Sequence, residues 1–266
     1  MNATVGFIGT GNMGGALARA VCQAVPPQQV TLANRTAKKA EILAAELDCR
    51  FGSNEDAARC DYIFLGVKPQ MMAGMLREIA PILQSRGGRF VLVSMAAGLT
   101  CAQIREMAGV NCPVLRIMPN TPVAVGQGVV QVCALDTEED TLDTFIRMLA
   151  PAGLVDLIPE SLMDAAGSVS GCGPAFAYLF MEALADGGVA CGLPRDKAIT
   201  YAAQMLAGSA KMVLESGQHP GALKDAVCSP GGSTIQGVRA LEEHGFRSAV
   251  MEAIIAAWEK NRILGK

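Results

Sequence analysis

The sequence has few of the residues that mark metal-binding, disulfide-rich or nucleic-acid-binding proteins. It holds two histidines, and no two of its nine cysteines lie closer than eleven positions, so it has no CxxC pair and no compact ligand cluster. Lys and Arg total 22 against 25 acidic residues, the net charge is -3, and no basic run occurs. We therefore expect no metal, no nucleic-acid partner, and a cytoplasmic protein with reduced thiols.

The sequence also has no pattern typical of a membrane span or a leader peptide. The mean hydropathy is positive at +0.31, but the most apolar long stretch, 174–193, carries Glu182 and Asp186 on one helical face. The first residues enter a strand pattern directly, without the charged and apolar regions of a signal peptide. We therefore expect no membrane partner.

The patterns along the chain change at about residue 160. Before it, short β-rich apolar runs alternate with helical segments, which predicts βαβ units and a parallel sheet covered on both faces. The predicted strands are 4–8, 30–33, 62–67, 89–94 and 113–118, and the predicted helices between them are 11–24, 36–47, 69–83 and 100–108. After residue 160 the strand patterns stop, and helices are interrupted at 171–174, 192–194, 219–221 and 230–232. The sequence thus predicts an α/β fold: a doubly wound Rossmann-type domain at 1–159, then an all-α domain at 160–266.

Three glycines near the N-terminus have the spacing of a dinucleotide-binding turn. Gly9, Gly11 and Gly14 form GxGxxG directly after the first predicted strand and directly before the first predicted helix. In such a turn the first glycine permits a tight bend, the second lets backbone approach a pyrophosphate, and the third lets the helix pack against the strand. The free N–H groups and the dipole of the helix favour the anionic phosphates. This context predicts a nicotinamide dinucleotide as cofactor.

The end of the second predicted strand indicates which dinucleotide is bound. An NAD-binding site would place an acidic residue there, but this sequence has Asn34, Arg35 and Thr36. A guanidinium pairs a 2′-phosphate in bidentate fashion, and no carboxylate repels it. We therefore expect NADPH, with NADH bound more weakly. The alternative is that Arg35 is a solvated residue at the start of a helix.

Two later strand ends also carry polar side chains. Ligands of doubly wound sheets bind outside the carboxyl ends of the strands, so Lys68 and Asn120 are predicted to reach the nicotinamide half. Each has a simpler explanation. For Lys68, the alternative is a solvent-facing cap before Pro69. For Asn120, it is a turn former ahead of Thr121 and Pro122.

Motifs over nearly the whole chain resemble those of pyrroline-5-carboxylate reductases. They are GFIGTGNMGG at 6–15, VKP at 67–69, AAG at 96–98, MPNTP at 118–122, SGCGPAF at 170–176, ALADGGVACGLPR at 183–195 and HPGALKDAVCSPGGSTIQGVRALE at 219–242. The resemblance implies NADPH-dependent reduction of the cyclic imine Δ1-pyrroline-5-carboxylate to L-proline, the last step of proline biosynthesis. It also implies that residues 160–266 bind substrate and join subunits into a homodimer or a higher oligomer.

The same resemblance implies roles for individual residues. The implied cofactor contacts are Gly9, Thr10, Gly11, Asn12, Met13, Asn34, Arg35, Thr36, Asn54, Val67, Lys68, Pro69, Ala97 and Gly98. The implied loop for the substrate carboxylate comprises Ser229, Gly231, Gly232, Ser233 and Thr234. The chain departs from the family pattern at Cys172, where serine is commoner, and Cys228 stands ahead of Ser229. Neither cysteine replaces a group with an expected chemical role.

A Gly-Gly-Ser-Thr loop that opens a helix supplies backbone N–H groups and two hydroxyls, which form a neutral cradle for an anion. Thr234 is the predicted catalytic residue, because its hydroxyl would hydrogen-bond the ring nitrogen of the imine. A strong general acid is less necessary for an imine that binds already protonated. His219 and His244 stand at expected helix ends, so we predict structural roles for both.

Two other functions remain open from the sequence. A β-hydroxyacid dehydrogenase shares the N-terminal pattern and needs a catalytic lysine, for which Lys197 and Lys211 are candidates, but the expected DxxxSGG segment is missing. A non-catalytic NADPH-binding sensor would keep the dinucleotide turn and transfer no hydride.

Overall fold

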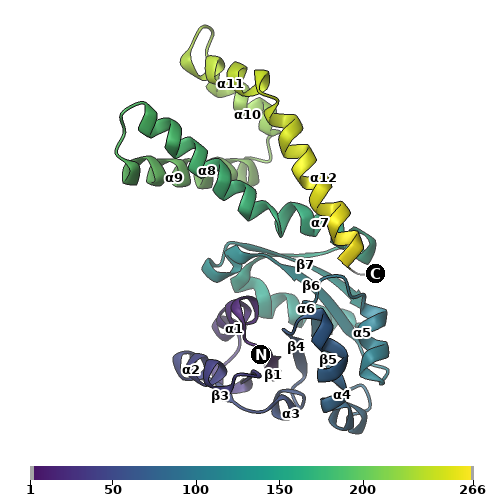
Figure 1. Ribbon diagram of the computed structural model, residues 1–266. Helices are drawn as coiled ribbons and strands as arrows, with labels where there is room; N and C mark the ends of the chain where they lie inside the picture. The colour runs from purple at the N-terminus through teal and green to yellow at the C-terminus, as the bar shows by residue number, and fades with distance from the viewer. Residues whose placement is uncertain (1–2, 265–266) are drawn as a thin grey trace. The chain divides into compact units, whose positions relative to one another are not determined.

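The computed structural model describes residues 3–264, and its helices and strands are labelled in Figure 1. The chain divides into two compact units, residues 1–172 with 257–266, and residues 173–256. Compactness alone does not define where a folding domain ends, so the boundary between residues 159 and 160 stays a prediction.

A single eight-stranded sheet organises the described part of the first unit. Its strand order is β3-β2-β1-β4-β5-β6-β7-β8. The strands are β1 (Val5–Ile8), β2 (Val30–Ala33), β3 (Arg50–Phe51), β4 (Tyr62–Leu65), β5 (Val91–Ser94), β6 (Val114–Pro119), β7 (Gly128–Leu135) and β8 (Gly153–Leu157). β1 lies at the centre, where Val5 pairs in parallel with Val30 on one side and with Tyr62 on the other. This order reverses direction at β1, as in a doubly wound fold, and the predicted fold class is confirmed.

The five predicted strands run parallel to one another, as expected, but the sheet also contains β7, for which the sequence predicted no strand and which is not parallel to β6. β6 and β7 pair antiparallel, with Val114 opposite Leu135 and Pro119 opposite Val130. A parallel connection needs a crossover of a dozen or more residues. The segment 120–127 is shorter and holds one 3-10 turn, η2 (Thr121–Val125), so the strand returns beside β6 in the opposite direction.

Helices cover both faces of the sheet because neighbouring strand residues point to opposite sides. The helices of this unit are α1 (Asn12–Ala24), α2 (Ala37–Leu47), α3 (Asn54–Ala57), α4 (Pro69–Ser85), α5 (Cys101–Ala108), α6 (Glu139–Leu149) and α7 (Met163–Ser170). Phe7 and Phe64 belong to a core with Phe145 of α6, and the rings of Phe7 and Phe64 stack with centroids 4.4 Å apart. Ile8 and Leu65, one position further, belong to the core under α4 and α5.

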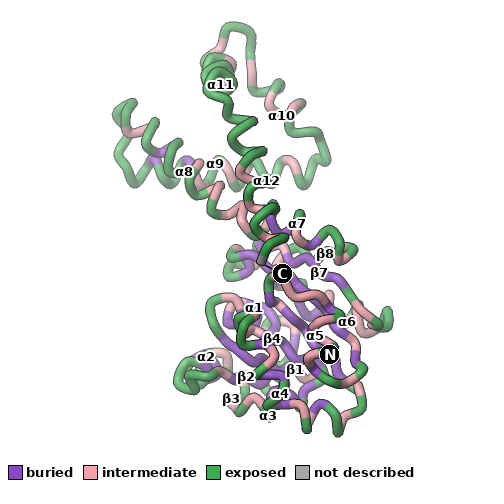
Figure 2. Tube along the Cα trace, turned by 45° about the vertical axis from the view of Figure 1, so that its right-hand side comes forward, coloured by how far each residue is buried: buried purple, intermediate pink, exposed green. Residues whose placement is uncertain are grey.

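The second unit consists of helices, as the sequence predicts after residue 160. They are α8 (Gly173–Ala190), α9 (Arg195–Ser216), α10 (Pro220–Val227), α11 (Ser233–Glu243) and α12 (Phe246–Leu264), whose last turns belong to the first unit. Of residues 173–256, all of which are described, only Ala185, Ala198 and Ala202 are buried, and Figure 2 shows these helices almost wholly as exposed or intermediate. A single copy of this unit therefore has almost no core of its own. Within residues 3–264, no helix combines the length and the apolar character that crossing a membrane requires.

Candidate functional site

The glycine turn between β1 and α1 leaves no room for side chains at two of its three glycines. Gly9 has a φ of 102°, and a Cβ there would lie 2.5 Å from the carbonyl oxygen of Gly66. A Cβ on Gly14 would lie 2.2 Å from the carbonyl oxygen of Gly9. Around Gly11, in contrast, a Cβ would meet no described atom within 4 Å. The fold itself thus requires Gly9 and Gly14, whereas Gly11 faces space that a ligand can use.

Polar groups of this turn are left without protein partners. The buried hydroxyl of Thr10 has no hydrogen-bond partner among the described residues. Gly11 is the N-cap of α1, and no described side chain caps the helix, so its first N–H groups face the same region. A cavity of about 490 Å³ opens beside the turn, lined partly by Thr10, Gly11, Asn12 and Lys39. These features fit the phosphates of a dinucleotide.

The end of β2 carries positive charge without matching carboxylates. Asn34 accepts a hydrogen bond from the Thr10 N–H at 3.2 Å and donates one to the carbonyl of Thr36 at 3.1 Å, which ties this strand end to the glycine turn. Arg35 is exposed, and its Nη1 lies 3.9 Å from the sulfur of Met71. In the part of the chain that the structure describes, Arg35 forms no ion pair. A guanidinium in this setting suits a phosphate.

Other predicted cofactor residues lie at neighbouring strand ends. Lys68 is exposed at the N-cap of α4, between Val67 and Pro69. Ala97 and Gly98 follow β5, which pairs with β4. Asn54 begins α3, and its Nδ2 donates to Glu78 Oε1 at 3.2 Å. Because parallel strands end at one edge of the sheet, the residues after β1, β2, β4 and β5 share that edge.

Asn120 has polar contacts within the protein. It is 7% exposed, its Nδ2 donates to the carbonyl of Ser170 at 2.9 Å, and its Oδ1 accepts from the N–H of Val129 at 2.9 Å. Both side-chain atoms thus connect the end of β6 with β7 and α7. This is a structural role, and its contact with a cofactor stays a prediction.

The predicted carboxylate loop lies in the second unit, between α10 and α11. Gly231 adopts a φ of 70°, and the N–H of Gly232 donates to the carbonyl of Ser229 at 3.0 Å. Gly232 is the N-cap of α11 without a side-chain cap from any described residue, and Ser233 and Thr234 are exposed in the first turn. The loop therefore presents uncapped N–H groups and two hydroxyls, as an anion cradle requires.

Both histidines cap helices, as predicted. Nδ1 of His219 accepts a hydrogen bond from the N–H of Gly221 at 3.0 Å at the start of α10. Nδ1 of His244 lies 2.8 Å from the carbonyl oxygen of Ala240 at the end of α11. Lys197 and Lys211, the candidates for a dehydrogenase lysine, are exposed on α9.

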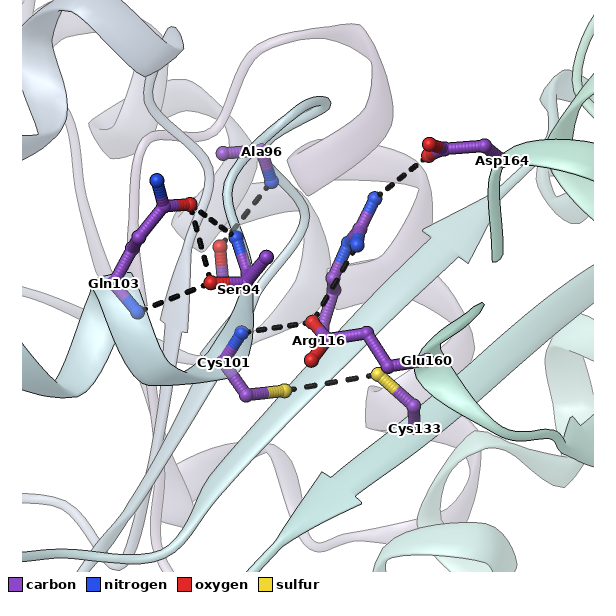
Figure 3. Close-up of polar contacts among 9 residues, drawn as sticks. Ser94, Ala96, Cys101, Gln103, Arg116, Cys133, Glu160 and Asp164 are labelled. Carbon is purple, nitrogen blue, oxygen red and sulfur yellow. Dashed lines mark hydrogen bonds and ion pairs between the residues drawn. The ribbon is translucent and has the colours of Figure 1, made fainter. Parts of the chain in front are cut away.

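A buried ionic cluster was not anticipated from the sequence (Figure 3). Arg116 on β6 is 4% exposed, and its Nη1 and Nη2 lie 3.4 Å and 3.2 Å from the carboxylates of Glu160 and Asp164. Glu160 Oε1 also accepts from the N–H of Cys101, 2.8 Å away and 59 residues earlier in the chain. The available signal was a single arginine inside the apolar run PVLRIM, because a buried charge needs a partner.

Two thiols lie beside this cluster. The Sγ atoms of Cys101 and Cys133 are 3.6 Å apart, and the two thiols and a Glu160 oxygen all lie within 4.8 Å of one another. This group contains ligand types that a metal could use, but Arg116 contacts the same carboxylate, and its positive charge opposes a cation there. The hydrogen bond to Cys133, followed by burial, raises the pKa of Cys101.

Comparisons with known proteins agree with the geometry over the whole chain. Residues 160–264 match the family model of pyrroline-5-carboxylate reductase dimerisation, and residues 4–98 match that of coenzyme F420-dependent NADP oxidoreductases. The pyrroline-5-carboxylate reductase of Escherichia coli strain K12 is 42% identical to this chain, and the alignment covers 100% of both chains. That of Glycine max is 41% identical, over 98% of this chain and 96% of the relative. The crystal structure of Plasmodium falciparum pyrroline carboxylate reductase with NADP bound has a TM-score of 0.88 and 34% identity, covering 100% of this chain and 99% of that one. The chain therefore belongs to the pyrroline-5-carboxylate reductase family.

Proposed function

We propose that the chain reduces Δ1-pyrroline-5-carboxylate to L-proline with NADPH, the last step of proline biosynthesis. The observation that carries this proposal is the presence of two uncapped, glycine-rich helix starts. One follows β1 and suits a dinucleotide, and the other precedes α11 and suits a small carboxylate. Membership of the family supports the reaction, since relatives that match the full length carry this name.

The first unit holds the cofactor, which supplies a hydride when bound. The Thr10 hydroxyl and the first N–H groups of α1 bind the pyrophosphate, for which Gly11 leaves space. Arg35, with Asn34 and Thr36, binds the 2′-phosphate, so NADPH binds more tightly than NADH. Asn12, Met13, Asn54, Val67, Lys68, Pro69, Ala97, Gly98 and Asn120 complete the proposed cofactor contacts.

The second unit holds the substrate. The N–H groups and hydroxyls of Ser233 and Thr234, with Ser229, Gly231 and Gly232, bind the carboxylate without a buried cation. The Thr234 hydroxyl hydrogen-bonds the ring nitrogen and orients the C=N carbon. Fixing the reacting atoms in contact can contribute about 7–11 kcal/mol to catalysis, so orientation by these residues carries much of the rate.

The helical unit also joins copies of the chain. Its buried residues are three alanines, while large apolar side chains on its helices remain exposed. They include Tyr178, Leu179, Ile199, Tyr201, Met205, Met212, Leu214, Val250, Met251 and Ile255. Covering such surface with a second copy stabilises both. We expect a homodimer or higher oligomer through these helices, measurable by size-exclusion chromatography with light scattering; a monomer at micromolar concentration would contradict this.

The cytoplasm suits the chemistry of the thiols. The nine cysteines are all free, and Cys101 and Cys133 lie 3.6 Å apart without a bond between them. A reducing compartment keeps such a pair reduced. Within the chain, residues 1–159 serve cofactor binding, and residues 160–266 serve substrate binding and assembly.

The proposed reaction is tested by following NADPH oxidation at 340 nm with purified protein and Δ1-pyrroline-5-carboxylate. NADH is run in parallel, and β-hydroxyacids are assayed with NADP⁺. Turnover of the imine with a lower KM for NADPH than for NADH is expected. Turnover of a β-hydroxyacid alone, abolished by Lys197→Ala or Lys211→Ala, would favour the dehydrogenase. Cofactor binding without any turnover would favour the sensor.

Cofactor preference is tested at Arg35. Because hydrogen bonds to charged groups contribute about 1.5–3 kcal/mol, Arg35→Ala should raise the KM for NADPH about 10- to 100-fold. The KM for NADH should change little, since NADH has no 2′-phosphate. Arg35→Lys is the matched control, because it keeps the charge and loses the bidentate geometry. An equal rise in both KM values would show that Arg35 does not contact the 2′-phosphate.

A further inference from the structure

The loop between β5 and α5 is held at both ends by hydrogen bonds. At its start the N–H of Ala96 donates to the buried Ser94 hydroxyl at 3.3 Å. At its end the N–H of Thr100 donates to Gln103 Oε1 at 2.8 Å, as part of a capping box. Ala97, between these anchors, is exposed. The loop follows the carboxyl end of β5, next to β4 in the sheet.

Glu160 adds an anchor from a distant part of the chain. It lies on η4 (Glu160–Leu162), and its Oε1 accepts from the N–H of Cys101, the first residue of α5, at 2.8 Å. A carboxylate at a helix N-terminus satisfies a free N–H and interacts favourably with the helix dipole. Figure 3 shows this oxygen shared between Cys101 and Arg116.

Arg116 explains why the carboxylate stays in this place. The guanidinium is buried on β6, and its two terminal nitrogens reach Glu160 at 3.4 Å and Asp164 of α7 at 3.2 Å. A buried charge is strongly destabilising when it loses its partner. Glu160 is therefore held between a rigid strand and the start of α5, while Asp164 links the same guanidinium to α7.

We propose that Glu160, held by Arg116, is a positioning residue that fixes the start of α5 and with it the loop 96–98. The loop stands at the carboxyl edge of the sheet, where doubly wound folds bind their ligands. The proposed 2′-phosphate contacts follow β2, and β1 and β4 lie between β2 and β5 in the sheet. The loop after β5 is therefore on the nicotinamide side of the proposed cofactor site. This last step rests on the proposed function. Glu160 thus acts on hydride transfer through the loop and touches no reacting atom.

The test compares Glu160→Ala with Glu160→Gln in the full-length protein. Alanine removes the acceptor of the Cys101 N–H, whereas the amide oxygen of glutamine keeps one. Hydrogen exchange of a peptide spanning 95–104, measured without cofactor, should accelerate about tenfold in Glu160→Ala and less in Glu160→Gln. In turnover, kcat of Glu160→Ala should fall about tenfold while the KM for the imine stays within about twofold. With 4-deuterated NADPH, the kinetic isotope effect of Glu160→Ala should be larger than that of the parent protein.

Asp164→Asn is the matched control, because it weakens the other contact of Arg116 and leaves the Cys101 N–H bonded. Its exchange in 95–104 and its isotope effect should resemble those of the parent. Unchanged exchange in a folded Glu160→Ala protein would overturn the inference, and so would faster exchange with unchanged kcat and isotope effect. Failure of the parent protein to turn over the imine would instead count against the proposed function, because the exchange result does not depend on activity.

Discussion

Replacing Gly11 with alanine is expected to abolish most NADPH binding and to leave the fold intact. A Cβ at this position meets no described atom within 4 Å, and the φ of -69° suits any residue, so the free energy of unfolding should stay nearly constant. The same methyl group enters the space that a pyrophosphate needs beside the start of α1. We expect at least about a 100-fold weaker Kd, because phosphate contacts of roughly 3 kcal/mol are displaced. Titration by NADPH fluorescence and a thermal unfolding curve measure the two quantities.

Gly14→Ala is the matched control for this prediction. Its added Cβ would lie 2.2 Å from the carbonyl oxygen of Gly9, so the turn or the helix must shift. This variant should lose stability and binding together, whereas Gly11→Ala loses binding alone. If Gly11→Ala bound NADPH as tightly as the parent, the pyrophosphate would not lie against this turn.

Thr234→Ala should lower kcat about 100-fold with little change in NADPH affinity. The hydroxyl lies in the first turn of α11, where Gly232 leaves the helix uncapped. Removing one polar group that stabilises the reacting atoms commonly costs about 100-fold in rate. Because the dinucleotide turn lies in the other unit, cofactor affinity should remain near that of the parent. Steady-state kinetics with the imine and fluorescence titration with NADPH separate these effects.

Thr234→Ser provides the matched comparison, since it keeps the hydroxyl and removes one methyl group. It should retain most of the activity if the hydroxyl bonds the ring nitrogen. An equal loss of NADPH affinity in Thr234→Ala would place this residue in the cofactor half of the site. Ser233→Ala is expected to raise the KM for the imine more than it lowers kcat, because Ser233 serves carboxylate binding.

Local patterns were sufficient for much of the fold. The strand β2 has the predicted bounds, and the helices α1 and α2 begin one residue after the predicted starts. Prolines and glycines marked the helix boundaries of the second unit correctly, including the start of α11 after Gly232. These features depend on residues close together in the chain, through hydrogen bonds and backbone angles that each segment satisfies by itself.

Pairing between distant segments was harder to predict from the sequence. The sequence analysis predicted no strand for β7 or β8, and the antiparallel return of β7 depends on the short connection after β6. Asn120 stands at a predicted ligand edge, yet its amide bonds Ser170 and Val129. A polar residue at a strand end fits a ligand and a structural partner equally well in the sequence. Only the position of the partner decides between them.

The sequence by itself determined the glycine-rich helix starts, the alternation of the strands β1, β2, β4, β5 and β6 with helices, and the resemblance to pyrroline-5-carboxylate reductases. Each of these follows from residue types at short, fixed spacing. Only the tertiary structure decided that Arg116, Glu160 and the Cys101 N–H share one buried cluster, since Glu160 lies 59 residues beyond Cys101. Such contacts form because a buried charge must find a counter-charge, and the strand order and helix packing decide which carboxylate is within reach.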